Sequence, residues 1–337
     1  MSSDFTEARS GVWAPVQEAS VTRPAAQRSP HRWAVLHAGG DGTRLQGLTI
    51  KIAGDSRPKQ FCSIIGGDSL LAQTRARVEP LFHVDRELFV VTRVHEIYYR
   101  EELRDVEDSR IISQPLNRGT GVAVAVALLH ILQKDPEAVV IFVPCGHYYS
   151  DVEACCFAVR SAISGAEQYP DSVILVGAKA HYPEVDYGWI EVGSTISHTP
   201  TPLMQVERFW EKPSLPQAKA LLQSGCLWNT FLTVGHVRTF LDLVCSQVPD
   251  VVASLSKALS KNKLEVAYPL MPTVDLSRQV WTPQPHRLLA IPDSTSGWTD
   301  LGSPTRVMDI LTRDKLQPAW LRDEQVFSMI GDRRKEH

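Results

Sequence analysis

The sequence predicts an α/β fold with a mostly parallel central sheet and helices on both faces of that sheet. Short, continuously apolar runs recur along the chain, and segments with helical spacing separate them. A continuously apolar run is typical of a strand buried on both faces, and regular alternation of strands with helices is typical of parallel sheets. From Tyr187 onward the pattern changes, and it predicts antiparallel strands inserted near the carboxyl ends of the sheet.

The predicted elements follow one another in a regular order. The first strand covers residues 32–38 and runs directly into Gly39-Gly40. Later apolar runs predict strands at residues 88–92, 139–143, 173–176 and 288–291, and the antiparallel pair is predicted at residues 188–192 and 206–210. Helical spacing occurs at residues 69–78, 121–132, 216–224 and 237–248.

Three segments of different character divide the 337 residues. Residues 1–31 are rich in Ser, Ala, Pro and Arg and lack periodicity, so we expect a flexible tail. Residues 32–312 contain all the predicted elements and form the folded domain. Residues 313–337 are charged, and we expect them to fray as a C-terminal tail.

Charge and hydropathy exclude several classes of function. The chain has 35 Lys and Arg residues against 38 Asp and Glu, so it lacks the basic excess that neutralises nucleic-acid phosphates. The longest apolar run is shorter than the roughly 18 residues that span a bilayer, and the first residues lack the apolar core of a secretory signal. We therefore predict a cytoplasmic protein with no nucleic-acid or membrane partner. Its six cysteines are expected to be thiols, because they contain no C-x-x-C pair.

A glycine-rich turn follows the first predicted strand. Residues 39–45 read Gly-Gly-Asp-Gly-Thr-Arg-Leu, and three closely spaced glycines let backbone N–H groups point inward around an anion. The turn lacks the Gly-Lys-Ser/Thr ending of a P-loop and the spacing of the dinucleotide fingerprint. A tight turn alone would also explain the glycines. Arg44 in the turn and Lys59 in the following Pro-Lys-Gln-Phe favour a phosphate site, since both cations could reach one polyphosphate.

Six motifs together resemble one enzyme family. They lie in order at residues 38–45, 58–61, 114–120, 209–213, 227–229 and 297–303. The set resembles the sugar-nucleotide pyrophosphorylases, which are nucleotidyltransferases, and especially the mannose-1-phosphate guanylyltransferases. The resemblance covers about residues 33–308 and implies a Rossmann-like (GT-A-like) fold with an inserted antiparallel sugar-binding region.

The resemblance also implies a reaction and its nucleotide-binding residues. A sugar 1-phosphate, here mannose 1-phosphate, would attack the α-phosphorus of an NTP, here GTP, and release pyrophosphate. Since two anions must meet, catalysis would depend on positioning and on neutralising charge. Arg44 and Lys59 would be the catalytic residues that hold the phosphates. The implied nucleotide-binding residues are Gly39, Gly40, Gly42, Thr43, Gln114 and Gly119, of which Gln114 and Gly119 would meet the base.

The remaining motifs are implied to bind the sugar phosphate and a metal ion. Gly188 would line the sugar pocket, Glu211 would accept hydrogen bonds from sugar hydroxyls, Lys212 would pair with the sugar phosphate, and Asn229 would contact the sugar. Asp300 is the metal candidate, because the implied cofactor Mg²⁺ prefers carboxylate oxygens. A helix N-cap is the alternative role for Asp300.

Two positions depart from the family pattern. The family reads Pro-x-Asp-His at the end of its central strand, with the Asp as a magnesium ligand, whereas residues 144–147 here read Pro-Cys-Gly-His. The expected carboxylate is therefore absent at Gly146, and Asp151 lies too far along the chain to replace it simply. Phe231 also departs from the common Trp-Asn-Ser-Gly, which concerns the sugar pocket.

Two alternatives stand beside this enzyme. Gly146 favours a catalytically weak paralogue that binds nucleotide or sugar nucleotide and regulates a partner. The enzyme is favoured by four intact residues of the motifs: Arg44, Lys59, Lys212 and Asp300. Cytidylyltransferases of isoprenoid synthesis share the glycine loop and Pro-Lys, but not the Glu-Lys-Pro and Trp-Asn motifs. The sequence leaves open the base, the sugar and a homodimer.

Overall fold

The computed structural model describes residues 29–197 and 201–322. Residues 1–28 of the predicted N-terminal tail and residues 323–337 of the predicted C-terminal tail lie outside the described residues. Residues 29–31 are described, and His31 Nδ1 lies 2.8 Å from Asp135 Oδ1. The chain therefore makes tertiary contacts just before the first predicted strand.

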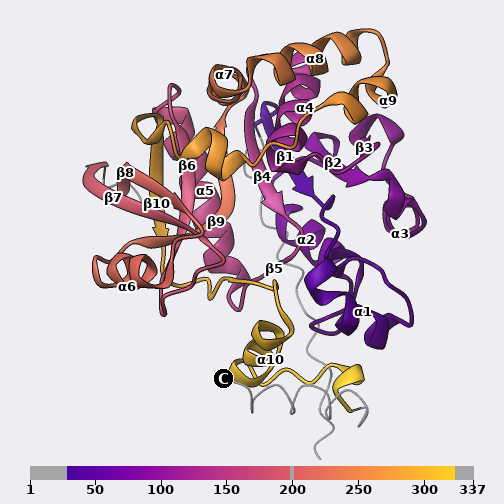
Figure 1. Cartoon of the computed structure of the whole chain (residues 1–337), viewed down its shortest axis with the longest axis vertical. Helices are drawn as coiled ribbons and strands as arrows, with labels where there is room; N and C mark the ends of the chain where they lie inside the picture. Colours follow the sequence, from indigo (N-terminus) through magenta and orange to yellow (C-terminus); the bar gives the residue numbers. More distant parts are fainter. Residues whose placement is uncertain (1–28, 198–200, 323–337) are drawn as a thin grey trace, which may run out of the picture.

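A nine-stranded sheet forms the centre of the molecule (Figure 1). Its strands are β1 (Arg32–His37), β2 (Glu87–Thr92), β3 (Ile111–Gln114), β4 (Val139–Pro144), β6 (Val173–Lys179), β7 (Gly188–Ser197), β8 (Leu203–Glu211), β9 (Leu227–His236) and β10 (Leu288–Asp293). They lie in the order β3-β2-β1-β4-β9-β6-β10-β8-β7. Only β8 and β9 run against the others, since every pairing of these two strands is antiparallel. The sheet is thus mostly parallel in strand direction, as predicted.

Helices cover both faces of this sheet. One face carries α4 (Gly119–Lys134), α7 (Val237–Gln247), α8 (Pro249–Ser260) and α9 (Leu264–Ala267), and the other carries α2 (Leu70–Val78), α3 (Glu96–Glu102), α5 (Val152–Gln168) and α6 (Leu215–Gln223). Strand β1 shows why both faces are apolar. Trp33 and Val35 pack in the first core, whereas Ala34 and Leu36 pack in the second, because successive side chains of a strand point to opposite faces.

The predicted antiparallel region is the hairpin of β7 and β8. The start of β9 also pairs with β7, through Trp228 opposite Trp189, whereas the end of β9 pairs with β4, through His236 opposite Val139. Strand β9 therefore links the hairpin to the parallel part of the sheet, and a short ladder of β5 (His147–Tyr148) with β11 (Thr299–Asp300) lies beyond the end of β4.

A third apolar cluster joins the two ends of the domain. Helix α1 (Gln46–Ala53) and helix α10 (Pro304–Arg313) pack together through residues that include Leu48 and Ile310. Residues 314–322 continue this packing, and Trp320 Nε1 donates a hydrogen bond to the Ile64 carbonyl at 2.9 Å. The expectation that the chain frays from residue 313 is therefore wrong for this part of the tail, because Trp320 and Leu321 have apolar partners there.

Two further features bear on the sequence predictions. All six cysteines are free thiols, as predicted, and five of them are buried. Within the two described ranges, no helix has both the length and the apolar character needed to cross a membrane.

Candidate active site

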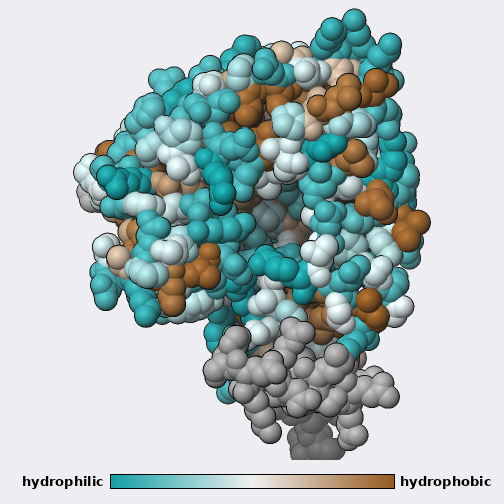
Figure 2. Space-filling model, in the orientation of Figure 1, coloured by the Kyte–Doolittle hydropathy of each residue, from teal (hydrophilic) through white to brown (hydrophobic). Residues whose placement is uncertain are grey.

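A cavity of about 490 Å³ lies at the carboxyl ends of β1 and β4 and at the first turn of α4. Figure 2 shows the molecule hollowed in the region where Figure 1 places β4 and β5. The lining residues come from six separate segments: His37, Gly39, Gly40 and Arg44; Lys59 and Gln60; Gln114, Asn117, Gly119, Thr120 and Ala123; Pro144, Cys145, Gly146 and His147; Phe231; and Asp300. The cavity thus brings together seven of the predicted site residues.

Hydrogen bonds from outside the turn fix the glycine turn. Gln60 Nε2 donates to the carbonyls of Ala38 and Gly40, at 2.8 Å in each case. Thr92 Oγ1 donates to the Gly39 carbonyl at 2.8 Å. These hydrogen bonds hold the carbonyls of Ala38, Gly39 and Gly40 in place. Gln60 belongs to the Pro-Lys-Gln-Phe motif, but its support of the turn could not be read from the sequence.

The glycines of the turn have different structural reasons. Gly42 has a φ of 64°, a conformation that side chains disfavour, and an added Cβ would lie 3.0 Å from the Lys59 backbone nitrogen. Gly40 has no atom within 4 Å of an added Cβ, so it borders open space. Gly42 and Thr43 are not among the cavity-lining residues, whereas Gly39 and Gly40 are.

Gln114, at the end of β3, and Gly119, at the start of α4, also line the cavity. Gln114 is buried, and its Oε1 accepts a hydrogen bond from Tyr268 Oη at 3.1 Å. Gly119 has a φ of 81°, and an added Cβ would overlap the Val274 carbonyl. The close approach of the Val274 backbone therefore requires glycine at this position, whether or not a nucleotide base also packs against it. Asn117, which the sequence analysis did not single out, accepts the Gly119 N–H at 3.0 Å.

Lys59 and Asp300 form an ion pair at the centre of the cavity. Lys59 Nζ donates to Asp300 Oδ1 at 2.8 Å and to the Leu301 carbonyl at 2.9 Å. The side chains are only 18% and 15% exposed. The ladder of β5 with β11 sets Asp300 opposite His147, and so fixes its place beside the end of β4. Burial alone would raise the pKa of Asp300, but the nearby Lys59 ammonium, with His147 and Arg306, holds that pKa below its usual range.

Two arginines extend this network of charges. Arg306 Nη1 lies 3.5 Å from Asp300 Oδ2, and Arg306 Nη2 lies 2.7 Å from Glu184 Oε2. Arg44 Nη1 lies 3.2 Å from Asp186 Oδ2, and the Arg44 side chain is 59% exposed. Arg44 thus lies at the mouth of the cavity and Arg306 behind Asp300. No motif in the sequence pointed to Arg306, Glu184 or Asp186.

Two neutral histidines complete the cavity. His147 Nδ1 accepts a hydrogen bond from Trp298 Nε1 at 3.1 Å, and burial lowers the pKa of His147 to about 4. Burial also lowers the pKa of His37 to about 4, and its ring packs 5.3 Å from that of Phe142. Phe231, whose ring lies 6.2 Å from His37, has a φ of 61°, which is strained for a bulky side chain.

The predicted sugar-binding residues lie together at the ends of three neighbouring strands. Gly188 on β7 is opposite Glu211 on β8, and an added Cβ at Gly188 would lie 3.0 Å from Glu211 Oε2. Lys212 Nζ lies 3.5 Å from Glu211 Oε1. Asn229 on β9 accepts the Phe231 N–H at 3.1 Å. These four residues do not line the cavity, but Asn229 is joined to it through Phe231.

Glu211 is in a different electrostatic environment from Asp300. Burial raises the pKa of Glu211, and the nearby Asp275 raises it further, while Lys212 opposes both effects. A carboxyl group with a raised pKa stays neutral up to a higher pH, and a neutral carboxyl group can both donate and accept hydrogen bonds with hydroxyl groups.

The residues present do not fit a protein-bound divalent metal ion. Nucleotidyltransferases commonly use such ions, and Asp300 is the predicted ligand. In the part of the chain that the structure describes, no group of three or more His, Cys, Asp or Glu side chains could hold a metal. Asp151 instead caps α5 by accepting the Ala154 N–H at 2.9 Å. Asp300 does not have the alternative role of a helix N-cap, because Ser303 is the N-cap of α10.

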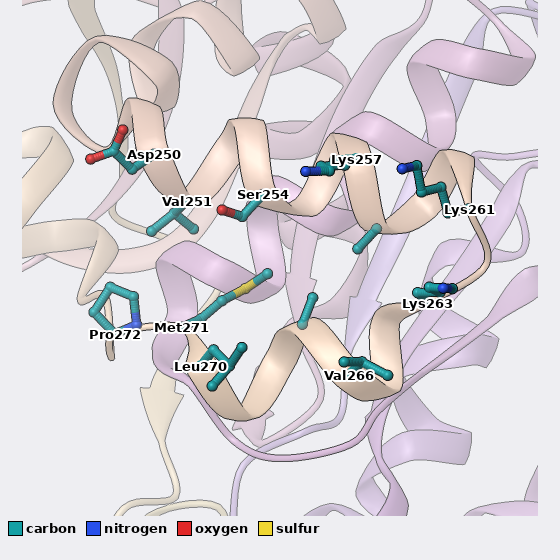
Figure 3. A pocket seen from close by; sticks show the side chains of 12 residues that line it. Asp250, Val251, Ser254, Lys257, Lys261, Lys263, Val266, Leu270, Met271 and Pro272 are labelled. Carbon is teal, nitrogen blue, oxygen red and sulfur yellow. The ribbon is translucent and has the colours of Figure 1, made fainter.

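A second concave surface shares no residue with this cavity. It lies between α8 on one side and α9 with the segment that follows it on the other, and Figure 3 shows Met271, Leu270 and Val266 facing Val251 and Ser254 across it. Lys257, Lys261 and Lys263 lie at one end. None of the six sequence motifs contributes to this surface, so the candidate active site is the cavity at β1 and β4.

A glycine turn and cations at the carboxyl ends of parallel strands are features with which α/β proteins bind phosphorylated ligands. The family model for nucleotidyl transferases matches residues 33–315, and the chain belongs to this nucleotidyl transferase family. The large mixed α/β sheet agrees with its structural neighbours.

Several curated proteins are similar to this chain over most of its length. Xanthan biosynthesis protein XanB of Xanthomonas campestris is 28% identical over 291 residues, 83% of this chain and 59% of that protein. Mannose-1-phosphate guanylyltransferase 2 of Escherichia coli O157:H7 is 26% identical over 302 residues, 84% of this chain and 60% of that protein. The chain thus spans about three fifths of the length of these curated relatives.

Solved structures agree with this family. A Thermus thermophilus protein described as a mannose-1-phosphate geranyltransferase has a TM-score of 0.73 and 26% identity, and the match covers 85% of this chain and 80% of that one. A UDP-glucose pyrophosphorylase solved with UDP-glucose shares the fold, with a TM-score of 0.51 at 15% identity over 84% of this chain and 97% of that one.

Proposed function

We propose that this chain transfers a nucleotidyl group from GTP to mannose 1-phosphate. An oxygen of the sugar phosphate attacks the α-phosphorus, the bond from that phosphorus to the leaving oxygen breaks, and pyrophosphate departs. The observation that supports this proposal is the single cavity that collects residues from the glycine turn, Pro-Lys-Gln-Phe, residues 114–120 and Asp300. The choice of GTP and mannose 1-phosphate follows the relatives named mannose-1-phosphate guanylyltransferase.

In this proposal, positioning and charge supply the catalysis. The N–H groups of Gly39 and Gly40 and the guanidinium of Arg44 bind the triphosphate. Lys59 neutralises the charge that develops as pyrophosphate leaves. Gln114 and Gly119 lie against the base. Gly42 and Thr43 contribute to nucleotide binding by shaping the turn.

The sugar phosphate binds on the neighbouring strand ends. Glu211 and Asn229 hydrogen-bond sugar hydroxyls, Lys212 pairs with the phosphate, and Gly188 leaves room for the ring. This division agrees with the lining of the cavity, which includes Gly39, Gly40, Gln114 and Gly119 but none of the four sugar residues. No step in this proposal passes through a metal ion held by the protein, because the donor set does not fit one.

A pyrophosphate-release screen tests the proposal. GTP, ATP, UTP, CTP and dTTP are each combined with mannose 1-phosphate and its epimers, with and without Mg²⁺, and the NDP-sugar is identified by mass. We expect the highest turnover with GTP and mannose 1-phosphate. Greater turnover with another pair would replace our substrates, and CTP with a non-sugar phosphate would indicate the cytidylyltransferase alternative.

A catalytically weak regulatory paralogue is the second candidate. Gly146 favours it, because the carboxylate expected at this position is absent, and so does the pairing of Lys59 with Asp300, because it occupies a cation that the reaction would use. Calorimetric binding of GTP or GDP-mannose without pyrophosphate release would favour this candidate. The cytoplasmic location and the homodimer stay predictions.

A further inference from the structure

The side chain of Lys59 runs across Gly146. An added Cβ at residue 146 would overlap Lys59 Cε and would lie 2.8 Å from Nζ. The path of the lysine to Asp300 and the Leu301 carbonyl is therefore open because residue 146 has no side chain. Gly146 and Lys59 are structurally coupled, although 87 positions separate them in the sequence.

The charges around Asp300 oppose a further cation. Arg306 Nη1 lies 3.5 Å and Arg44 Nη2 lies 4.0 Å from Asp300 Oδ2, while Lys59 holds Oδ1. Among the described residues that line the cavity, Asp300 is the sole carboxylate, whereas Arg44 and Lys59 are cations. Arg44 also pairs with Asp186 and Arg306 with Glu184, whereas Lys59 pairs with Asp300. A divalent ion at Asp300 would therefore have to displace the Lys59 ammonium or bind against its charge. The same charges attract a phosphate.

Lys59 can contact a phosphate without leaving Asp300. An ammonium group has three N–H donors, and Asp300 and Leu301 accept two of them. The third donor remains for an anionic oxygen. A cation between a carboxylate and a phosphate is the arrangement by which a bound metal bridges protein and nucleotide.

We propose that the Lys59 ammonium takes the place of a protein-bound divalent cation at Asp300 and bridges this carboxylate to the nucleotide phosphates. Gly146 makes the arrangement sterically feasible. The contact with the nucleotide rests on the proposed function, whereas the replacement of the metal at Asp300 does not.

Manganese titration tests the replacement without substrate. Mn²⁺ prefers the same oxygen ligands as Mg²⁺, and the electron paramagnetic resonance signal of the free ion measures binding to the full chain. We compare the wild type with Gly146→Asp and the matched Gly146→Asn, which has similar volume but adds no charge. Both side chains displace Lys59, but only Gly146→Asp supplies a second carboxylate.

The wild type is expected to leave the free Mn²⁺ signal unchanged, and Gly146→Asp is expected to bind one Mn²⁺ about tenfold more tightly than Gly146→Asn. Thermal melting confirms that each variant is folded. One Mn²⁺ bound by the wild type and lost in Asp300→Asn would overturn the proposal. So would a folded Gly146→Asp that binds Mn²⁺ no better than Gly146→Asn.

Nucleotide binding supplies an independent arm. The affinity of the wild type for GTP is measured by calorimetry in Mg²⁺ and in EDTA, and we expect the two values to agree within about threefold. A loss of tenfold or more in EDTA would contradict the bridge by Lys59. Absence of GTP binding in both conditions would reject the proposed function, while the manganese titration would still decide whether Lys59 replaces the metal.

Discussion

Two lysine–carboxylate pairs lie in the two parts of the site, and they differ in nearly every respect. Lys59 and Asp300 are 2.8 Å apart and mostly buried, and the pKa of Asp300 is lowered. Lys212 and Glu211 are 3.5 Å apart, Lys212 is 54% exposed, and the pKa of Glu211 is raised. The pKa values of the two carboxyl groups are therefore shifted in opposite directions, although each is paired with a lysine.

The difference teaches that the surrounding charges decide what such a pair can do. Asp300 is surrounded by cations, whereas Glu211 has Asp275 nearby and a lysine that is open to solvent. An exposed lysine loses much of its attraction to solvent screening. The first pair is suited to fixing a cation against phosphate, and the second to hydrogen bonding with a neutral sugar.

The largest effect is expected from Lys59→Ala, which breaks the first pair. A lost charge-assisted contact of about 1.5–3 kcal/mol lowers kcat/KM by roughly 10- to 150-fold. Arg306 still accompanies Asp300, so the variant is expected to fold. Steady-state pyrophosphate release measures the loss, and the exposed Lys219→Ala is the control. Equal kinetics of Lys59→Ala and Lys219→Ala would remove Lys59 from the site.

Gly42→Ala tests the close packing of the glycine turn against the backbone of Lys59. The left-handed backbone of Gly42 costs an L-residue about 1–2 kcal/mol, and the new Cβ would lie 3.0 Å from the Lys59 nitrogen. We expect a loss of that size in urea denaturation. Gly40→Ala is the matched control, because its Cβ meets open space, and it should change stability by less than about 0.5 kcal/mol. Equal stability of the two variants would contradict this account of the turn.

Lys212→Ala sharpens the comparison from the sugar side. Because Lys212 is half exposed, we expect a smaller effect, about a fivefold to tenfold rise in KM for the sugar 1-phosphate. The KM for the nucleotide should not change. Initial rates at varied concentrations of each substrate separate the two constants. A rise in the nucleotide KM alone would show that the division between nucleotide and sugar residues is wrong.

The smallest effects are opposite pH dependences of stability. Glu211 has a raised pKa in the folded state, so its ionised form destabilises the fold at neutral pH. Glu211→Gln should therefore be more stable than the wild type at pH 7, and the difference should vanish below the unfolded pKa of about 4.3. Urea denaturation between pH 7 and pH 3 measures both proteins. A difference that does not change with pH would exclude this cause.

Asp300→Asn should show the reverse sign. The lowered pKa of Asp300 stabilises the fold above its unfolded pKa of about 3.9, and this stability is lost as pH falls through the folded pKa. The variant should be less stable than the wild type at pH 7, with a difference that shrinks in acid. The same sign for both variants would contradict the comparison of the two pairs.

Local sequence was sufficient for the elements and the residue types of the site. A continuously apolar run predicted β1 as a strand buried on both faces, and the structure places Trp33 and Ala34 in different cores. Helices α2, α6 and α7 also begin and end within two residues of their predicted bounds. The glycine turn was recognisable because backbone conformation depends on neighbouring residues. The left-handed backbone at Gly42 is such a local property.

Only the tertiary structure decided how those residues meet. Lys59 and Asp300 are 241 positions apart, and they pair because β5 and β11 form a ladder beside the end of β4. The sequence showed that Gly146 lacks the carboxylate expected at this position. That this glycine leaves room for the Lys59 side chain became evident only in the tertiary structure. Arg306, which has no motif, and Trp320, in the predicted tail, are further examples. The order of the strands in the sheet brings such distant residues together, and a local pattern of hydropathy or propensity does not specify which strands lie side by side.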